Sequence, residues 1–487
     1  MASTSNTLQQ NHKEGAVRHA EKRRIATCRF ADRVAAVSIE AFKQRVPQKW
    51  REENKQVCLA TFVVHLEQVD GEEGRLDVIS LGVGTKYLSQ ETLRKEYDAP
   101  DFEYGKRIRD SHAEVLARRA LRKKILIEIK NCMKGSSSEL LQAMETKDGK
   151  QQFQLKQGVS IHMYTSSTPC GNSSLKKFAT LSKEKFNDDL EKDEWPTNMH
   201  EAIPAHSLHL GQLALLVKKD ISANEKCGAI DEAKFAHLPK KQRKWPANIS
   251  DEWCPPNTAP PRIGKGSIHS CSDKICRWNY LGLQGSLLSS LLDGPLYMKS
   301  ITIGRKFSRV TAQRAVCCRG LCNKLRVKRK RDDKDKDVVE QLDEKYKHSC
   351  PSVMCTAEYL DDSGVLEMSG EKVIGQDVRF LSTLCWLWYC NNENGSNVTH
   401  AECINGETGL VYDYKQGKKT SNTSSISTFQ MTLDFIEVEK IQDAVFVHTL
   451  GDLRNLKRQV ASDYEAAKDI LLTKHQVFNM WNRRNGL

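Results

Sequence analysis

The pattern of apolar and polar positions predicts a folded core that begins near residue 29. The segment 29–44 places most of its apolar side chains on one helical face, which predicts a helix. Residues 58–66 and 76–84 are rich in β-forming residues and are separated by the turn signal Asp-Gly-Glu-Glu-Gly, so we expect two strands joined by a hairpin. Residues 1–28 are polar and predict a flexible tail.

The rest of the pattern favours an α/β fold. Residues 111–130 contain neither Gly nor Pro and give the clearest predicted helix, with Ser111 as a candidate N-cap. Further predicted elements are a strand at 159–167, a turn and buried helix at 267–292, a strand at 296–304 and a closing helix at 464–481. A strand followed by a turn and a helix is typical of α/β proteins.

Two charged stretches interrupt this pattern. The first, near 181–261, contains a Pro-rich run, and the second, near 323–348, alternates basic and acidic residues. We expect both to be surface insertions. No segment approaches the ~18 consecutive apolar residues of a membrane-spanning helix, so no membrane partner is expected.

The charge balance points to a polyanionic partner. Among 487 residues, 75 Lys and Arg face 62 Asp and Glu, a net charge of +13. Nucleic acid is the most abundant intracellular polyanion, although a basic surface without a dedicated partner explains the charge equally well. The N-terminus lacks a secretory apolar core, so we expect an intracellular protein of the nucleus or cytoplasm whose sixteen cysteines are thiols or metal ligands.

The sequence His-x-Glu can place an imidazole on a metal and a carboxylate beside metal-bound water. The triplet is weak evidence by itself, because it occurs at His12, His19, His65, His112 and His400. Context favours His112 and its partner Glu114, which alone open a strong predicted helix after a strand and loop.

Cys170 is the best candidate thiolate ligand. It follows Pro169 at a predicted strand-to-helix turn, where a helix N-terminus lowers a thiol pKa. Zinc nucleobase deaminases combine His-x-Glu with Pro-Cys-x-x-Cys, but the third position after Cys170 is Ser173. The second thiolate must come from elsewhere, and on spacing alone a small buried thiol remains the alternative reading of Cys170.

A longer set of motifs resembles one enzyme family. The run SCSDKICRWNYLGLQGSLLS at 270–289 closely resembles the deaminase-domain signature of the adenosine deaminases that act on double-stranded RNA and on tRNA. The other matching blocks, in the family's order, are GTK at 84–86, DSHAEVLARR at 110–119, STPCG at 167–171, LYMKSITIG at 296–304, ECINGETG at 402–409 and YEAAK at 464–468.

The resemblance implies the fold and the chemistry. It implies a three-layer cytidine-deaminase-like α/β fold with a mixed central sheet and helices on both faces, in one editase domain over 29–487. It further implies that His112, Cys170 and Cys271 bind one catalytic zinc ion with water as the fourth ligand. Glu114 would carry protons while activated water attacks C6 of a flipped adenine, which gives inosine and ammonia.

Members of the family also bury an inositol hexakisphosphate, and the resemblance implies the same here. Matching positions are Arg118, Arg119, Lys274, Arg277, Trp278, Arg458, Tyr464, Lys468 and Trp481. Each cation taken singly is explained by a solvated helix face. Thr85 and Lys274 also match a polar relay between the zinc site and this ligand.

The substrate is expected to be tRNA. About 28 residues precede the first predicted helix, which leaves no room for a separate RNA-binding module and favours the branch that edits adenosine 37 of alanine tRNA. Candidate RNA contacts are Lys86, Lys324, Lys328 and Arg329. The run at 324–331 could equally be a nuclear localisation signal, or a solvated loop balanced by the acidic residues that follow it. The alternatives are a deaminase of double-stranded or other structured RNA and a silent RNA-binding scaffold, and no obligatory protein partner is evident.

Five further cysteines could suggest a second zinc site. They are Cys317, Cys318, Cys322, Cys350 and Cys355. Their irregular spacing favours reduced thiols instead.

Overall fold

The computed structural model describes most of the expected core. The described residues are 29–54, 58–68, 73–88, 103–145, 151–171, 269–305, 309–318, 345–356, 383–391, 398–441 and 447–474, with a few single positions between these ranges. The proposed RNA contacts Lys324, Lys328 and Arg329, the candidate Trp481, the tail 1–28 and the segment 181–261 lie outside them.

The strands are β1 (Leu59–Leu66), β2 (Arg75–Val83), β3 (Thr85–Tyr87), β4 (Asp110–His112), β5 (Leu141–Glu145), β6 (Gln151–Leu155), β7 (Val159–Ser167), β8 (Met298–Arg305), β9 (Ser352–Cys355), β10 (Leu384–Asn391), β11 (Val398–Asn405), β12 (Leu410–Asp413) and β13 (Lys418–Lys419). The helices are an N-terminal helix at 29–45, α2 (Gln48–Glu53), α4 (Glu103–Lys106), α5 (Ala113–Met133), α12 (Cys271–Leu281), α13 (Gly285–Ser289), α14 (Arg309–Gln313), the π-helical turn η3 (Arg314–Cys318), α16 (Thr428–Glu439), α17 (Leu450–Val460) and α18 (Ser462–Lys474).

A mixed sheet forms the middle layer. Its strand order is β13-β12-β11-β10-β2-β1-β7-β8-β9. The pairs β1–β2, β1–β7 and β2–β10 are antiparallel, whereas β7–β8 and β8–β9 are parallel. The structure confirms the mixed sheet of an α/β fold and the predicted antiparallel pairing of the first two strands.

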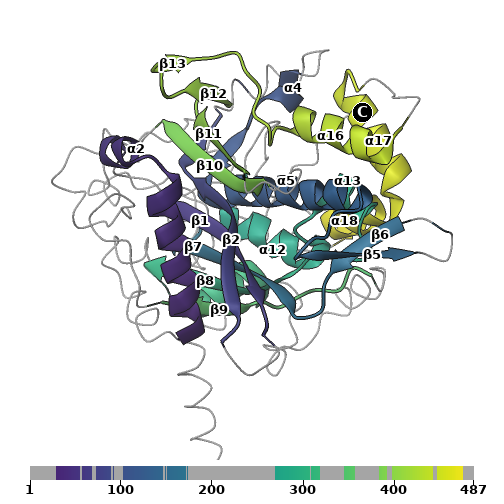
Figure 1. Cartoon of the computed structure of the whole chain (residues 1–487), viewed down its shortest axis with the longest axis horizontal. Coiled ribbons are helices and arrows are strands. Elements are labelled where there is room, and N and C mark those ends of the chain that lie inside the picture. The colour runs from purple at the N-terminus through teal and green to yellow at the C-terminus, as the bar shows by residue number, and fades with distance from the viewer. Residues whose placement is uncertain are drawn as a thin grey trace, which may run out of the picture.

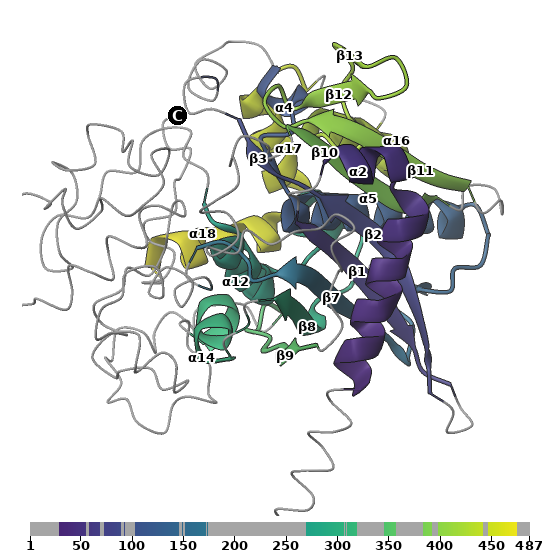
Figure 2. The same cartoon turned by 90° about the vertical axis from the view of Figure 1, so that its left-hand side faces the viewer.

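Helices cover both faces of this sheet, as the alternation of side chains along β1 requires (Figure 1). Phe62 and Val64 pack with Leu121 of α5 in one apolar cluster. Val63 packs instead with Val34 of the N-terminal helix in a second cluster. Figure 2 shows the N-terminal helix on one side of the sheet and α12 and α18 on the other. Among the described residues, no helix is long and apolar enough to cross a membrane.

The helix α5 lies unusually close to β2, and this closeness fixes the position of its first turn. A Cβ atom added to Gly82 would lie 2.4 Å from the Ala113 carbonyl oxygen and 2.5 Å from the Ala117 nitrogen. The Ala113 N–H also donates to the carbonyl of Gly84, at 3.0 Å. The glycines therefore let the start of α5 rest on the sheet backbone.

Several predicted boundaries were wrong by a few residues. Ser111 is not the N-cap of α5, because the chain at that point pairs as β4 with β3 and His112 takes the N-cap position. The predicted helix within 267–292 is interrupted at Gly282, whose φ of 81° ends α12 before α13 begins. The predicted insertion at 323–348 also overlaps the core, since Tyr346 is 2 % exposed and packs on Tyr464.

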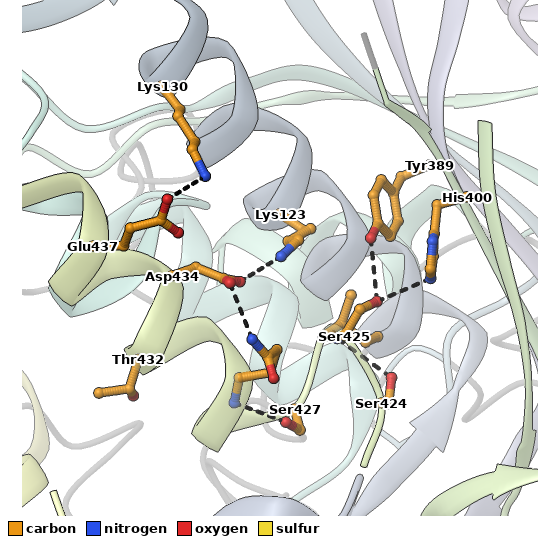
Figure 3. A network of polar contacts seen from close by, with 12 residues as sticks. Lys123, Lys130, Tyr389, His400, Ser424, Ser425, Ser427, Thr432, Asp434 and Glu437 are labelled. Carbon is orange, nitrogen blue, oxygen red and sulfur yellow. Dashed lines mark hydrogen bonds and ion pairs between the residues drawn. The ribbon is translucent and has the colours of Figure 1, made fainter. Parts of the chain in front are cut away.

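Two ion pairs join α5 to α16 (Figure 3). The side chains of Lys123 and Asp434 are 15 % and 19 % exposed, whereas Glu437, which pairs with Lys130 at 2.7 Å, is 63 % exposed. We expect Asp434→Ala to lower the free energy of unfolding by about 1–3 kcal/mol, because it leaves the partly buried Lys123 ammonium without its carboxylate partner. Glu437→Ala is the matched control and should cost about 0–1 kcal/mol. Urea unfolding of both variants checks this, and equal losses would contradict it.

Candidate active site

Four predicted site residues meet where two helices begin. His112 ends β4, Glu114 lies in the first turn of α5, and Cys271 is the first residue of α12. Cys170 follows β7, and its sulfur accepts from the Cys271 backbone N–H at 3.2 Å. The fold therefore brings these four side chains together, although 159 positions (271 − 112) separate His112 from Cys271.

A carboxylate holds the His112 ring in one orientation. The Asp110 Oδ1 atom lies 2.7 Å from His112 Nδ1, and the other Asp110 oxygen is paired with the Lys274 ammonium. A carboxylate on one ring nitrogen is the usual partner of a histidine that binds a metal through the other ring nitrogen. Lys274 was expected to bind the polyphosphate, but here its ammonium pairs with the carboxylate that orients His112. Asp110 is a site residue that the sequence analysis missed.

The two thiols form a polar pair. A hydrogen bond from the Cys271 thiol lowers the pKa of Cys170 against the opposing effect of burial. Burial, followed by the neighbouring Cys170, raises the pKa of Cys271 well above its ordinary value. The opposite directions show that the Cys271 thiol, as a hydrogen-bond donor, favours the thiolate form of Cys170.

The surroundings of His112 are strongly negative. Burial acts to lower the pKa of His112, but the charges of Asp110 and Cys170 outweigh it and raise this pKa to about 9. The potential that favours a proton on the imidazole would equally favour a metal cation in its place.

Glu114 is a buried carboxyl that can hold a proton. Its side chain is 6 % exposed, and burial raises its pKa, although His112 opposes that change. It also makes a hydrogen bond with Cys271. A raised carboxyl pKa suits a group that accepts and returns a proton near neutral pH.

These observations fit a tetrahedral zinc site. Two sulfurs and one imidazole are the donor set that Zn²⁺ prefers, and three protein ligands leave a fourth position for water. The orienting carboxylate on the far side of the ring is the usual partner of a zinc-bound histidine.

The Asp110 carboxylate should be required for tight metal binding. We expect Asp110→Asn to weaken zinc binding about 10- to 100-fold, because His112 loses its orienting partner. Asp77→Asn, at an exposed carboxylate of β2 paired with Arg75, is the control and should leave the affinity unchanged. Competition with a zinc chelator measures the change, and unchanged affinity in the Asp110 variant would contradict the assignment.

A second group of charged residues, most of them predicted, lies on α5, α12, α17 and α18. We call the following residues the cation cluster: Arg118, Arg119, Arg122, Arg277, Lys457 and Lys468. Burial, together with repulsion by its neighbours, holds the pKa of Arg118 well below its ordinary value. The pKa of Arg119 falls to about 10 and that of Lys457 to about 7, in both cases chiefly through burial.

Polar atoms around the cation cluster lack partners. The Arg118 guanidinium lies over the Trp278 ring, 4.9 Å from its centroid, yet within the described part of the chain the buried Arg118 Nε and Trp278 Nε1 atoms have no hydrogen-bond acceptor. Glu465 provides a carboxylate that is paired with Lys468. Buried donors and several cations that outnumber this carboxylate are the surroundings that a polyphosphate would satisfy.

The orientation of α17 places Lys457, and not the predicted Arg458, beside the other cations. Arg458 is exposed, whereas Lys457 faces Glu465, Lys468 and Arg122. We therefore propose Lys457 in place of Arg458 as a member of the cation cluster. The sequence analysis also missed Arg122, which lies on α5 one turn after Arg118 and Arg119. The Arg122 Nε atom donates to the Gln284 backbone carbonyl at 2.8 Å.

The other His-x-Glu triplets within the described residues serve packing. His65 lies in β1 and packs edge-on against Phe30. His400 lies in β11, stacks on the Tyr389 ring and forms a hydrogen bond with Glu402. The His400 ring also forms a hydrogen bond with Ser425, which precedes α16 (Figure 3). His12 and His19 lie outside the described residues. Lys86, a proposed RNA contact, lies in β3 and is half-buried.

Comparison with known proteins identifies relatives along most of the chain. The mouse double-stranded RNA-specific adenosine deaminase is 28% identical over 243 residues, 50% of this chain, and the match spans only 17% of that protein. The Drosophila melanogaster double-stranded RNA-specific editase Adar is 26% identical over 290 residues, 59% of this chain and 35% of that protein. Human tRNA-specific adenosine deaminase 1 is 24% identical over 524 aligned positions, which cover 93% of this chain and 98% of that protein.

A family model also matches most of the chain. The match runs from residue 80 to residue 485 and includes all four residues of the candidate site. The model describes the adenosine-deaminase (editase) domain. The chain therefore belongs to the adenosine-deaminase (editase) domain family.

Proposed function

We propose that this protein is a zinc-dependent tRNA adenosine deaminase that converts adenosine to inosine at position 37, beside the anticodon of alanine tRNA. The observation that carries the proposal is the convergence of His112, Glu114, Cys170 and Cys271 at the adjoining starts of α5 and α12. The likeness to human tRNA-specific adenosine deaminase 1 supports tRNA as the substrate, because it extends over 98% of that protein.

The metal would be held by His112, Cys170 and Cys271. When bound, zinc supplies a Lewis acid that lowers the pKa of water toward neutrality. Asp110 and Lys274 keep the His112 ring in place, and a dication compensates the charge of both thiolates.

Glu114 is assigned the proton transfers. The reaction consumes one water and one adenine and yields hypoxanthine and ammonia, so two protons must move: one proton of the water reaches the purine ring, and then the proton of the hydroxyl added at C6 reaches the departing amine. A buried carboxyl with a raised pKa can accept each proton and return it without exchange with bulk solvent.

The cation cluster is assigned to inositol hexakisphosphate. Its guanidinium and ammonium groups, with Trp278 and Tyr464 beside them, would donate hydrogen bonds to the phosphate oxygens. Arg118 and Arg119 lie one turn beyond Glu114 on α5, so the same helix would carry the catalytic carboxyl and two anchors of this anion.

The substrate class can be tested separately from the chemistry. We expect inosine to form faster in an anticodon stem-loop of alanine tRNA than in a perfect RNA duplex of equal adenosine content, since a loop adenine is extruded at lower cost. Both RNAs should be offered to one enzyme preparation and the inosine quantified by mass spectrometry. Faster reaction with the duplex would contradict tRNA as the substrate. It would favour double-stranded RNA, the second candidate because of the likeness to the mouse enzyme.

A further inference from the structure

A second group of metal-binding side chains lies outside the candidate active site. One ligand atom each from Cys317, His348 and Cys350 lies within 4.8 Å of the others. The Cys317 sulfur is 3.9 Å from His348 Nε2, and the Cys350 sulfur is 3.6 Å from His348 Nδ1. Cys317 belongs to η3 and is separated from His348 by 31 positions, so the fold, and not local sequence, brings them together.

The donor set is that of a zinc ion. Thiolate and neutral imidazole are preferred by Zn²⁺ over the hard cations Mg²⁺ and Ca²⁺. In a tetrahedral zinc site, sulfur and nitrogen ligands lie about 3.6 Å apart. The observed separations of 3.6 and 3.9 Å are close to that value, although each sulfur lies nearest a different ring nitrogen. An ion would therefore require the His348 ring to turn one nitrogen toward both sulfurs, and one ligand atom of each residue already lies within 4.8 Å of the others.

Charge and burial agree with an ion at this position. Cys317 is 1 % exposed, and His348 and Cys350 are half-buried. Two thiolates in such surroundings are costly unless they are neutralised, and a dication with a neutral imidazole gives a net charge of zero.

The group is packed against the helix that carries the active-site ligand Cys271. The Tyr280 ring of α12 lies 4.3 Å from the His348 ring. The side-chain amide of Asn279 in α12 donates to the Val316 backbone carbonyl at 2.7 Å. The backbone carbonyl of Asn279 accepts from the Ser349 N–H, also at 2.7 Å. An ion held here would fasten η3 and the segment before β9 to the same helix.

We propose that Cys317, His348 and Cys350 bind a structural zinc ion that clamps η3 and the segment leading to β9 against α12. The ion closes a long loop, so it stabilises the folded chain in the way a cross-link does. This ion is distinct from the one assigned to His112, Cys170 and Cys271.

Zinc counting by plasma mass spectrometry and native mass spectrometry tests the proposal. We expect Cys350→Ala to hold about one zinc ion per chain fewer than the parent protein. Cys355→Ala is the matched control, because Cys355 is an exposed thiol of neighbouring β9 and no member of the group. Equal zinc content in the parent and Cys350→Ala would overturn the proposal.

A measurement on the parent protein avoids dependence on a variant that fails to fold. Alkylation read by peptide mass spectrometry should leave Cys317 and Cys350 unmodified until a zinc chelator is added, whereas Cys355 should react at the same rate throughout. X-ray absorption of the zinc-loaded Cys271→Ala protein would report two sulfurs at about 2.3 Å and one nitrogen if only this site is filled. Rapid alkylation of Cys350 before chelation, or absorption without sulfur ligands, would contradict the assignment.

Discussion

Replacing Glu114 by Gln should lower kcat for adenosine deamination by about 10²–10⁴-fold, the usual contribution of a positioned acid and base. Gln keeps the size of the side chain and its capacity to hydrogen-bond with Cys271, but it can neither accept nor return a proton. The deficit should therefore appear in kcat, whereas RNA affinity and zinc content stay at the level of the parent protein. Single-turnover assays with excess enzyme measure the chemical step directly.

A matched control is available on the same helix. Glu128 is also buried, at 5 % exposure, but it pairs with Lys124 more than three turns beyond Glu114. Glu128→Gln should reduce stability and leave the deamination rate of the folded fraction close to that of the parent. If Glu114→Gln kept a rate within threefold of the parent, Glu114 would not be the proton carrier.

The second large effect concerns the cation cluster. Protein made in cells that cannot synthesise inositol hexakisphosphate should lose about 4 kcal/mol of unfolding free energy, the contribution of a ligand present at a thousand times its Kd. That loss is a large part of the ~5–15 kcal/mol that stabilises a folded domain. The physical reason is that the cations are buried and lie beside one another: burial, followed by the charges of neighbouring cations, already depresses the pKa of Arg118 and Lys457. Urea unfolding of protein from deficient and ordinary cells gives the difference.

The pH dependence of that protein adds an independent check. Lys457 has a pKa of about 7 in the folded protein, below the ordinary lysine value of ~10.5, so the unfolded chain binds more protons between these values. The anion-free protein should therefore become more stable as the pH rises from about 7. Lys457→Met should weaken this trend, and Arg458→Met, at the exposed neighbour, should not. Equal stability with and without the anion would remove the assignment.

The sequence was sufficient for the elements that carry strong local signals. The predicted strand at 159–167 agrees with β7, and the strong helix predicted from 111 exists as α5. Its start was misplaced because Asp110–His112 pairs with Thr85–Tyr87, and a pairing across the chain leaves no local signature. Hydrophobic pattern predicts helices and strands better than it predicts where pairing begins.

The candidate site divides in the same way. Motif order pointed to His112, Glu114, Cys170 and Cys271, whereas Asp110 was passed over although it is two residues from His112. The choice between Lys457 and Arg458 depends on the rotation of α17 against its neighbours, which sequence spacing does not fix. The grouping of Cys317 with His348 depends on how the chain returns to η3, so irregular spacing predicted separate thiols.

The central claim is that the four converging residues deaminate adenosine in tRNA, and one measurement tests it most directly. Total tRNA is incubated with zinc-loaded parent protein and, in parallel, with Glu114→Gln, and inosine is mapped as A-to-G changes on sequencing. The account predicts a change at position 37 of alanine tRNA with the parent protein and none with the variant. The absence of any A-to-G change with folded, zinc-loaded parent protein would contradict it and favour a silent RNA-binding scaffold.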